Sequence, residues 1–277
     1  MRFGVHLNIG KGLVRAAEHG VALGCECAQV FVRNPRGWAA GRFDEQAAAT
    51  FVQITAEAGI RPLAAHSSYL INLASPDPAL RTRSLQAVLE DCRRARMLGC
   101  RYLVLHAGHH RGSGLEAGLE AVATALQEVL AAAMEPMLLL ENTAGAGSEV
   151  GHTWHQLASV LNRLPPARTG MCLDTCHAHV AGYDVSSAEG VEIALAGLQR
   201  ELGLARLHLV HLNDARALAG SRWDAHEHIG EGTIGEEGFR ALLHHPALRD
   251  LPGILETPHR TPDDDARMLS RLRVWAA

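Results

Sequence analysis

Short apolar runs recur along the chain, and each is followed by a polar break and then by a segment with helical periodicity. The runs do not alternate between apolar and polar residues, which is typical of strands buried on both faces of a parallel sheet. We therefore predict eight strands. They span Phe3–His6, Ala28–Val32, Leu63–His66, Tyr102–His106, Met137–Glu141, Met171–Asp174, Leu207–His211 and Gly253–Glu256.

The segments between these runs repeat their apolar positions about every 3.6 residues, as amphipathic helices do. Several of them end at a glycine, such as Gly24, Gly59, Gly99 and Gly203, where a left-handed backbone can terminate a helix. The predicted helices cover residues 11–24, 44–59, 78–99, 115–134, 152–164, 186–203, 235–248 and 262–275.

Eight strand–helix units in 277 residues match the size of a (β/α)8 TIM barrel, an α/β fold. The alternative is a doubly wound open sheet, but no G-x-G-x-x-G motif follows the first strand. No linker, charge run or low-complexity stretch divides the sequence. We therefore expect a single TIM-barrel domain over residues 1–277.

The composition is that of an ordinary globular protein, with 47% hydrophobic and 20% charged residues. The formal net charge is −4, from 26 basic and 30 acidic side chains. This charge excludes a protein that holds nucleic acid by a large overall positive charge, although it leaves room for a local basic patch. Lys11 is the single lysine, whereas the 17 histidines call for a chemical explanation.

No apolar stretch reaches 18 residues, and the first residues lack the regions of a signal peptide, so we expect a cytoplasmic protein with no membrane partner. Six cysteines in a chain of this length do not form a disulfide scaffold, and none has the spacing of a zinc knuckle. We expect buried packing thiols at Cys25, Cys27, Cys92, Cys100, Cys172 and Cys176.

Six of the eight predicted strands stop at a histidine or a carboxylate, and in a barrel all of these ends point into one C-terminal mouth. Nitrogen and oxygen ligands of this kind suit Zn²⁺ or Mn²⁺, and there are too few cysteines for a thiolate site. The six strand-end residues are His66, His106, Glu141, Asp174, His211 and Glu256.

Three more side chains are expected to join this cluster. His177 lies one helical turn after Asp174, and Asp224 and His226 project to the same side of an extended loop, where His228 could follow them. Nine ligands suit two or three ions. Metals roughly 3.5–4 Å apart favour in-line displacement at phosphorus, which predicts a phosphodiesterase, although a two-metal sugar isomerase remains open.

With these residues, the sequence resembles the endonuclease IV family of abasic-site (AP) endonucleases, also called deoxyribonuclease IV. The resemblance runs from the first strand to the last in the same order, and the combination of ENTAG, DTCHA-x-x-AGYD and GEG-x-IG is highly specific. The matching stretches are NPRGW at 34–38, HSSYLINLASP at 66–76, VLHAGHH at 104–110, LLLENTAG at 138–145, CLDTCHAHVAGYD at 172–184, HLNDAR at 211–216, SRWDAHEHIGEGTIG at 221–235 and ILETP at 254–258.

The resemblance implies a barrel with three zinc ions in its mouth, with manganese as an alternative at one site. His66, His106 and Glu141 would hold the first ion. Glu141 would bridge to the second and would also orient the attacking hydroxide, which makes it the candidate catalytic residue. Asp174, His211 and Glu256 would complete the second site, and His177, Asp224 and His226 would form the third.

The implied activity is hydrolysis of the DNA backbone 5′ to an abasic site during base excision repair. It would leave a 3′-hydroxyl and a 5′-deoxyribose phosphate, and the same site would clean blocked 3′ ends. The partner would be double-stranded DNA, bound by a monomer. Arg36, Tyr69 and Leu70 match the side chains that the family inserts into the duplex at the lesion.

The sequence departs from the usual family pattern at Ser67, Ala107, His109 and His179, none of which replaces a ligand. These departures concern the surroundings of the metals rather than the class of reaction. We expect His109, His110, His179 and His228 to surround the site or to face solvent, and His6 to lie in the mouth beside the ligands.

Two rival functions remain. A xylose-isomerase-like sugar isomerase or epimerase also places histidines and carboxylates at its strand ends, but it would need only one or two metals and has no use for the Asp224-x-His226 pair. A non-catalytic protein that binds damaged DNA is the other rival, and the intact set of nine ligands argues against it.

Overall fold

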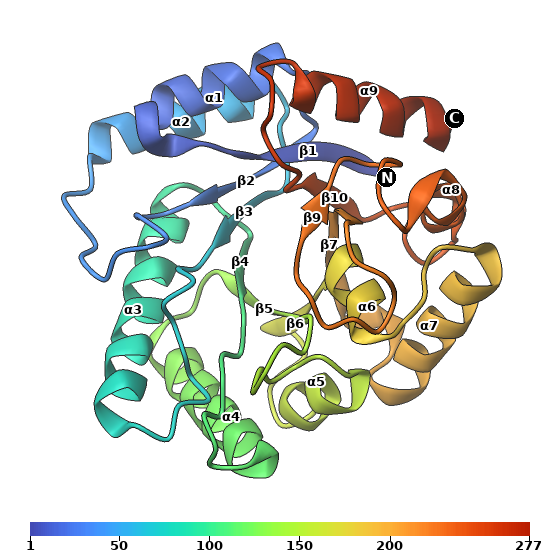
Figure 1. The fold of residues 1–277 in the computed structure, drawn as a ribbon. Coiled ribbons are helices and arrows are strands. Elements are labelled where there is room, and N and C mark those ends of the chain that lie inside the picture. Colours follow the sequence, from blue (N-terminus) through green and yellow to red (C-terminus); the bar gives the residue numbers. More distant parts are fainter.

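Eight parallel strands close into a barrel in the computed structural model, which describes residues 1–277 (Figure 1). Around the barrel the strands follow the order β1-β10-β7-β6-β5-β4-β3-β2, so neighbours in sequence are neighbours in space. The predicted TIM-barrel fold is confirmed. The strands are β1 Arg2–Leu7, β2 Cys27–Phe31, β3 Leu63–His66, β4 Tyr102–Leu105, β5 Met137–Glu141, β6 Thr169–Asp174, β7 Leu207–Leu212 and β10 Pro252–Leu255.

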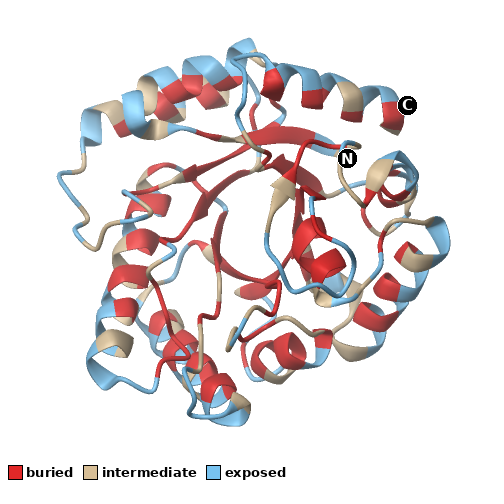
Figure 2. Cartoon of the chain, in the orientation of Figure 1, coloured by how far each residue is buried: buried red, intermediate tan, exposed pale blue.

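An outer ring of helices covers the barrel, and each helix turns its buried face toward the strands (Figure 2). All eight predicted helices are present. Their ends differ from the prediction by a few residues, as is usual where helices fray. The helices are α1 Leu13–Ala22, α2 Glu45–Glu57, α3 Pro78–Met97, α4 Leu115–Ala132, α5 Trp154–Leu161, α7 Ala188–Glu201, α8 Gly235–His244 and α9 Asp264–Ala276.

Local signals explain where several helices start and stop. The carboxylate of Asp44 accepts a hydrogen bond from the backbone N–H of Ala47 at the start of α2, and Asp77 caps α3 in the same way. At the other end, Gly59 and Gly99 have φ values of 70° and 66°, so the glycine stop signals in the sequence are borne out.

Besides two single-turn 3-10 helices, η1 Ile9–Lys11 and η2 Leu204–Arg206, two small elements at the mouth were not predicted. Helix α6, Thr175–Ala181, follows β6 directly, because the carboxylate of Asp174 accepts from the backbone N–H of His177 and caps the new helix. A two-stranded antiparallel hairpin, β8 Asp214–Ala215 and β9 His226–Glu227, follows β7. Both lie on the C-terminal side of the barrel, and both carry predicted metal ligands.

Two layers of side chains fill the interior of the barrel, and they differ in chemistry. The lower layer is apolar and fully packed. On seven of the eight strands an upper-layer residue lies two positions after a lower-layer residue, on the same inward face, because side chains alternate along a strand. On β1 the lower layer has no side chain, and on β4 it has a second one, Tyr102. The lower layer consists of Cys27, Ala64, Tyr102, Val104, Leu139, Cys172, Leu209 and Ile254. The upper layer consists of His6, Gln29, His66, His106, Glu141, Asp174, His211 and Glu256.

All six cysteines are buried free thiols, as predicted. Burial raises the pKa of Cys25 to about 11 and that of Cys100 to about 12, so both thiols stay protonated and pack as small apolar groups. None of the helices is both long enough and apolar enough to cross a lipid bilayer.

Candidate metal centre

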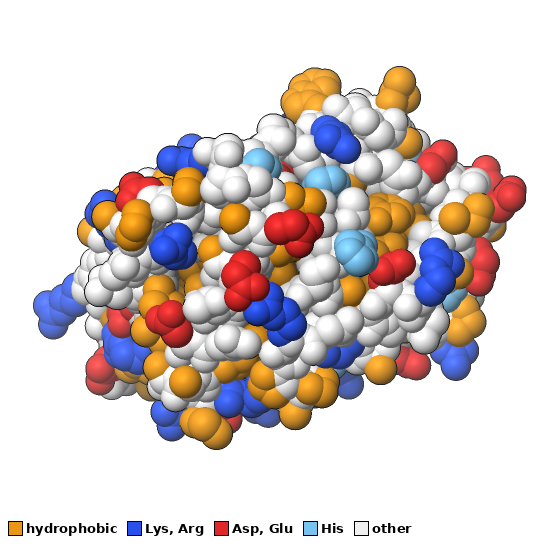
Figure 3. Space-filling view, turned by 90° about the horizontal axis from the view of Figure 1, so that it is seen from below, with side chains coloured by type: hydrophobic (Ala, Val, Ile, Leu, Met, Phe, Trp, Pro, Cys, Tyr) orange, Lys and Arg blue, Asp and Glu red, His pale blue; other side chains and the backbone are white.

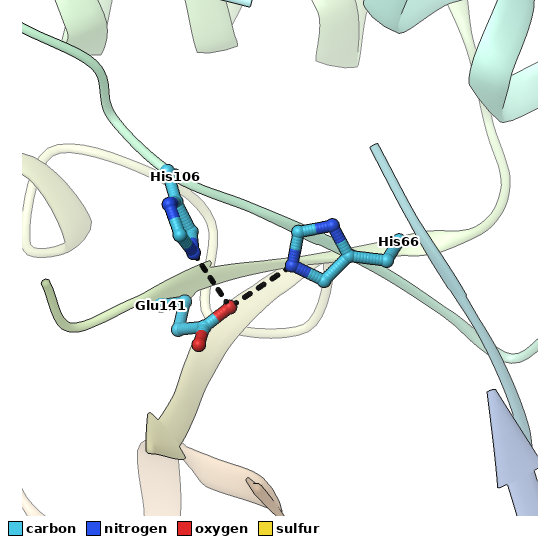
Figure 4. Close-up of side chains that lie close together, drawn as sticks. All are labelled: His66, His106 and Glu141. Atoms are coloured by element: carbon cyan, nitrogen blue, oxygen red, sulfur yellow. Dashed lines mark hydrogen bonds and ion pairs between the residues drawn. The ribbon is translucent and has the colours of Figure 1, made fainter. Parts of the chain in front are cut away.

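Glu141 lies at the centre of the upper layer, fully buried at the end of β5. One carboxylate oxygen, Oε2, lies 3.1 Å from Nε2 of His66 and 3.1 Å from Nε2 of His106 (Figure 4). The other oxygen, Oε1, lies 3.0 Å from Nδ1 of His211 and 3.3 Å from Nδ1 of His177. The two oxygens therefore face two different sets of histidines, as a bridging ligand would.

Asp174 and Glu256 complete a second group around His211. Potential ligand atoms from Glu141, Asp174, His211 and Glu256 all lie within 4.8 Å of one another. Nδ1 of His211 is 3.4 Å from Oε2 of Glu256 and 4.0 Å from Oδ2 of Asp174. Four elements from distant parts of the sequence thus supply one compact set of oxygen and nitrogen donors.

The third group forms where α6 meets the segment before β9. Asp224 places one oxygen 3.3 Å from Nε2 of His177 and the other 3.3 Å from Nε2 of His226. The new helix α6 turns His177 into the mouth, and the short strand β9 holds His226 opposite it. The structure therefore brings all nine predicted ligands together.

Backbone carbonyls fix the orientation of three of the histidine rings. Nδ1 of His66 donates to the carbonyl of Ser67 at 2.7 Å. Nδ1 of His177 donates to the carbonyl of Asn142 at 3.0 Å and also lies 3.3 Å from Oε1 of Glu141, while its Nε2 faces Asp224. Nδ1 of His226 donates to the carbonyl of Glu256 at 3.1 Å. Because a carbonyl can only accept, each ring keeps its proton on Nδ1 and turns Nε2 toward the carboxylates.

This arrangement fits metal ions well. A neutral histidine in this tautomer would point the lone pair of Nε2 at the lone pairs of a carboxylate, which repel it unless a proton or a cation lies between them. Nε2 of His226 is buried and has no hydrogen-bond partner, as expected of a nitrogen that is free to bind an ion. Histidine nitrogens and carboxylate oxygens together are a donor set typical of Zn²⁺ or Mn²⁺.

The electrostatics of the cluster agree with this interpretation. Although burial alone would raise the pKa of Glu141, the neighbouring His211 and His106 hold it well below its usual value. Burial alone would lower the pKa of His226, but Asp224 and Asp174 raise it to about 9. The carboxylates are therefore ionised and attract positive charge to the histidine positions.

Two upper-layer side chains support the ligands rather than joining them. Gln29 accepts from Nε2 of His211 through its Oε1 at 3.0 Å and donates from its Nε2 to Oε1 of Glu256 at 2.6 Å. His6 lies 2.9 Å from the same Glu256 oxygen, in the place expected for it. Gln29 was not predicted, but it lies two residues after inward-facing Cys27, so strand alternation could have identified it.

Asparagines near the strand ends also support the cluster. Asn213 donates to Oδ2 of Asp174 at 2.6 Å, and the side chain of Asn142 exchanges hydrogen bonds with the backbone of Asp174. These bonds fix the direction of the carboxylate before any ion arrives.

Four further histidines lie outside the cluster. His228 is buried but donates to the carbonyl of Pro258 at 2.7 Å, so it does not follow His226 into the mouth. His179 is buried beside Thr233, and His109 and His110 are half-buried in the loop after β4.

The predicted DNA-contacting residues meet at one side of the mouth. The loop that carries Arg36 and the loop that carries Tyr69 and Leu70 are joined by hydrogen bonds from Tyr69 N and Ser68 Oγ to the carbonyl of Pro35. Arg36 and Tyr69 are exposed. Tyr69 lies with its ring centroid 6.1 Å from that of His66, next to the metal cluster.

A cavity of about 970 Å³ opens beside the cluster, between the loops that follow β1, β2 and β10. Its lining includes Arg36 and Tyr69 from the rim together with His226 and Glu256 from the cluster. The space next to the ligands can therefore accommodate a group much larger than a water molecule, with cationic and aromatic side chains on its wall.

Comparison with known proteins places the chain in a family. The family model described as xylose isomerase-like TIM barrel matches residues 16–275. Two proteins named probable endonuclease 4, from Methanoculleus marisnigri and Halothermothrix orenii, are 44% and 39% identical to the chain. The alignments cover 99% of this chain and 98% and 99% of those relatives.

Comparison with solved structures supports the same family assignment. Endonuclease IV from Thermus thermophilus superposes with a TM-score of 0.88 at 38% identity, covering 99% of this chain and 98% of that one. A D-tagatose 3-epimerase-like protein superposes with a TM-score of 0.76 over 99% of this chain and 97% of its own, but at 18% identity this likeness shows the fold alone. The chain therefore belongs to the endonuclease IV family of AP endonucleases.

Proposed function

We propose that the protein is a zinc-dependent AP endonuclease of base excision repair. It hydrolyses the phosphodiester 5′ to an abasic site, leaves a 3′-hydroxyl and a 5′-deoxyribose phosphate, and removes blocking groups from 3′ ends. The observation that carries this proposal is the convergence of nine histidine, aspartate and glutamate side chains in one barrel mouth around the buried, two-sided carboxylate of Glu141.

The nine ligands divide into three zinc sites. His66, His106 and Glu141 would hold the first ion, and His177, Asp224 and His226 would hold the third. Glu141, Asp174, His211 and Glu256 would hold the second. The short separations within each set support this division, and manganese is an alternative at one site.

When bound, the zinc ions supply hydroxide near neutral pH and positive charge that a phosphate group can meet. The protein supplies orientation. Glu141 is the candidate catalytic residue, because its two oxygens face both sets of histidines and can align the attacking hydroxide. Carbonyl and amide acceptors hold the imidazole rings in fixed tautomers, so the ligand nitrogens are aimed before substrate arrives.

The substrate is double-stranded DNA with an abasic site or a blocked 3′ end. Arg36, Tyr69 and Leu70 lie together on the rim, where they can enter the duplex and fill the gap at the lesion. A nucleotide without a base has less stacking to lose, so it leaves the helix more easily than an intact one. This difference favours abasic sites over normal DNA.

One chain suffices for the reaction. All nine ligands and all three rim residues come from a single chain that spans nearly the full length of its relatives. We therefore propose that residues 1–277 act as a single domain and as a monomer. A side view shows cationic, acidic and apolar side chains interspersed (Figure 3), so on that face charge is not gathered for a second macromolecule.

The test uses a duplex with one tetrahydrofuran abasic analogue. We expect incision on its 5′ side, loss of incision on prolonged chelation, and about three zinc ions per chain by elemental analysis. Binding without incision would indicate a damage-binding protein. A single manganese or magnesium ion with epimerase activity on ketoses would replace the proposal with the sugar-epimerase alternative.

A further inference from the structure

Two large apolar side chains are exposed on a loop next to the third ligand group. This loop, residues 216–225, connects β8 to β9, and we call it the mouth loop. Trp223 is 60% exposed and Leu218 is 72% exposed. Trp223 directly precedes the ligand Asp224, so its backbone lies beside the third ligand group.

Hydrogen bonds hold the mouth loop in place. The backbone N–H groups of Gly220 and Arg222 donate to the carbonyls of His179 and Val180 in α6, at 3.1 and 2.9 Å. Arg222 has a φ of 54°, a left-handed conformation that is unusual for a non-glycine residue and is found mainly where the surroundings enforce it. The indole is therefore presented by a fixed backbone rather than by a loose tip.

Tyr69 and Trp223 lie beside different ligand groups of the metal cluster. Tyr69 is also 60% exposed, and its ring lies next to His66. From His66 the imidazole rings continue through His106 to His177, with centroids 5.4 and 5.6 Å apart, and His177 contacts Asp224 beside Trp223. A polymer held over the ligands can therefore meet one exposed aromatic residue beside the first group and another beside the third.

We propose that Trp223 is a DNA-contacting residue that packs against a base or sugar of the strand held over the metal centre. The inference rests on the proposed function, and it adds a second aromatic contact to the predicted one at Tyr69. The same loop carries the exposed cationic side chains of Arg216 and Arg222, which can complement phosphates, although Nε of Arg216 also lies 3.7 Å from Oε2 of Glu227. Aromatic rings next to cations are typical of surfaces that bind nucleic acid by stacking.

The first experiment follows the indole itself. Trp154 and Trp275 are buried, and Trp38 is half-buried beneath the guanidinium of Arg83, so Trp223 dominates the fluorescence that acrylamide can quench. In a Glu141→Gln, Trp38→Phe background, in which we expect DNA to stay intact and the indole of the Arg36 loop is removed, a tetrahydrofuran duplex should lower the quenching constant at least twofold. Trp223→Leu should abolish this protection. Protection that persists in Trp223→Leu would overturn the inference.

The second experiment is kinetic. We expect Trp223→Ala to raise KM for the abasic duplex roughly 10-fold, with a smaller effect on kcat, whereas Trp223→Phe keeps most of the affinity because it keeps a stacking face. Ile193→Ala is the matched control, since Ile193 is similarly exposed (66%) but lies on the outer helix α7.

The outcomes separate this inference from the proposed function. If the wild-type protein incises the duplex but Trp223→Ala behaves like Ile193→Ala, the assignment of Trp223 is wrong and the nuclease stands. If the wild-type protein fails to incise a duplex that it binds, and Trp223 is still protected from acrylamide, the contact stands and the proposed reaction is wrong.

Discussion

The two layers inside the barrel are built on the same strands yet have opposite chemistry. In β5, Leu139 packs in the lower layer and Glu141, two residues later, lies at the centre of the metal cluster. In β7, Leu209 and His211 show the same step. On these strands a step of only two residues therefore separates a buried apolar side chain from a predicted metal ligand.

The lower layer supports the upper one mechanically. Its side chains are at most a few per cent exposed, so the strands cannot shift against one another without breaking close packing. Strand positions in turn fix the Cβ atoms of the ligands. Changes in the lower layer should therefore reduce stability, and changes in the upper layer should reduce chemistry or metal binding.

The largest expected effect is that of Glu141→Gln. Removing the negative charge while keeping the shape should lower single-turnover incision by roughly 10³-fold or more, because the bridging carboxylate both binds metal and orients the nucleophile. Gel-shift binding to the abasic duplex should persist. Incision near the wild-type rate would show that Glu141 is not the bridging ligand.

Next in size is Leu139→Ala, in the lower layer of the same strand. Leu139 is fully buried, and its truncation should reduce the free energy of unfolding by about 2–5 kcal/mol. Urea denaturation measures this loss. Folded enzyme well below its melting temperature should still incise, in contrast to Glu141→Gln. Leu139→Met is the control, since it preserves volume and should cost less than about 1.5 kcal/mol. If Leu139→Ala lost activity without losing stability, the two layers would not be separable.

A third prediction concerns Gln29, the upper-layer residue that is not a ligand. Gln29→Leu removes both the acceptor for His211 Nε2 and the donor to Glu256, so zinc should be retained about 10–100-fold less tightly. Competition with a chromophoric chelator measures this affinity independently of activity. Cys27→Ala, two residues earlier in the lower layer, is the control and should leave zinc affinity unchanged. If the two variants bind zinc with equal affinity, Gln29 does not orient the ligands and only fills space in the barrel.

Much of this architecture was predictable from the sequence, because the signals are local. The apolar runs locate the strands, and glycines such as Gly59 and Gly99 mark helix ends. The ligands of the strand ends follow from the rule that a parallel barrel gathers its C-terminal strand ends at one mouth. The Asp224-x-His226 pair follows from alternation in an extended segment, and the structure brings the two side chains to 3.3 Å.

The remainder depends on contacts that the sequence does not display. Helix α6 and the β8–β9 hairpin are too short to leave a periodic pattern, and they form because Asp174 caps one and Asp214 supports the other. The carboxylate of Asp214 accepts hydrogen bonds from backbone N–H groups of the 230–235 loop, including those of Gly230 and Ile234. Gln29 was missed because glutamine is not a common metal ligand and its strand continues past it.

The smallest expected effect is a pH dependence that appears only when metal is removed. In the metal-free protein the folded-state pKa of His226 is about 9, above the ordinary value of 6.5, and those of His177 and His211 are raised too. A raised histidine pKa adds stability that is fully present below pH 6.5 and is lost as the pH rises through 9. After chelation, the free energy of unfolding should therefore fall between pH 6.5 and 9, by on the order of 1 kcal/mol for His226.

The zinc-loaded protein should not show this fall, since a bound cation replaces the proton between histidine and carboxylate. Urea midpoints at the two pH values measure the effect, and His226→Asn reduces it. If the chelated protein is equally stable at both pH values, the pKa of His226 is not raised by its carboxylate neighbours in the folded state.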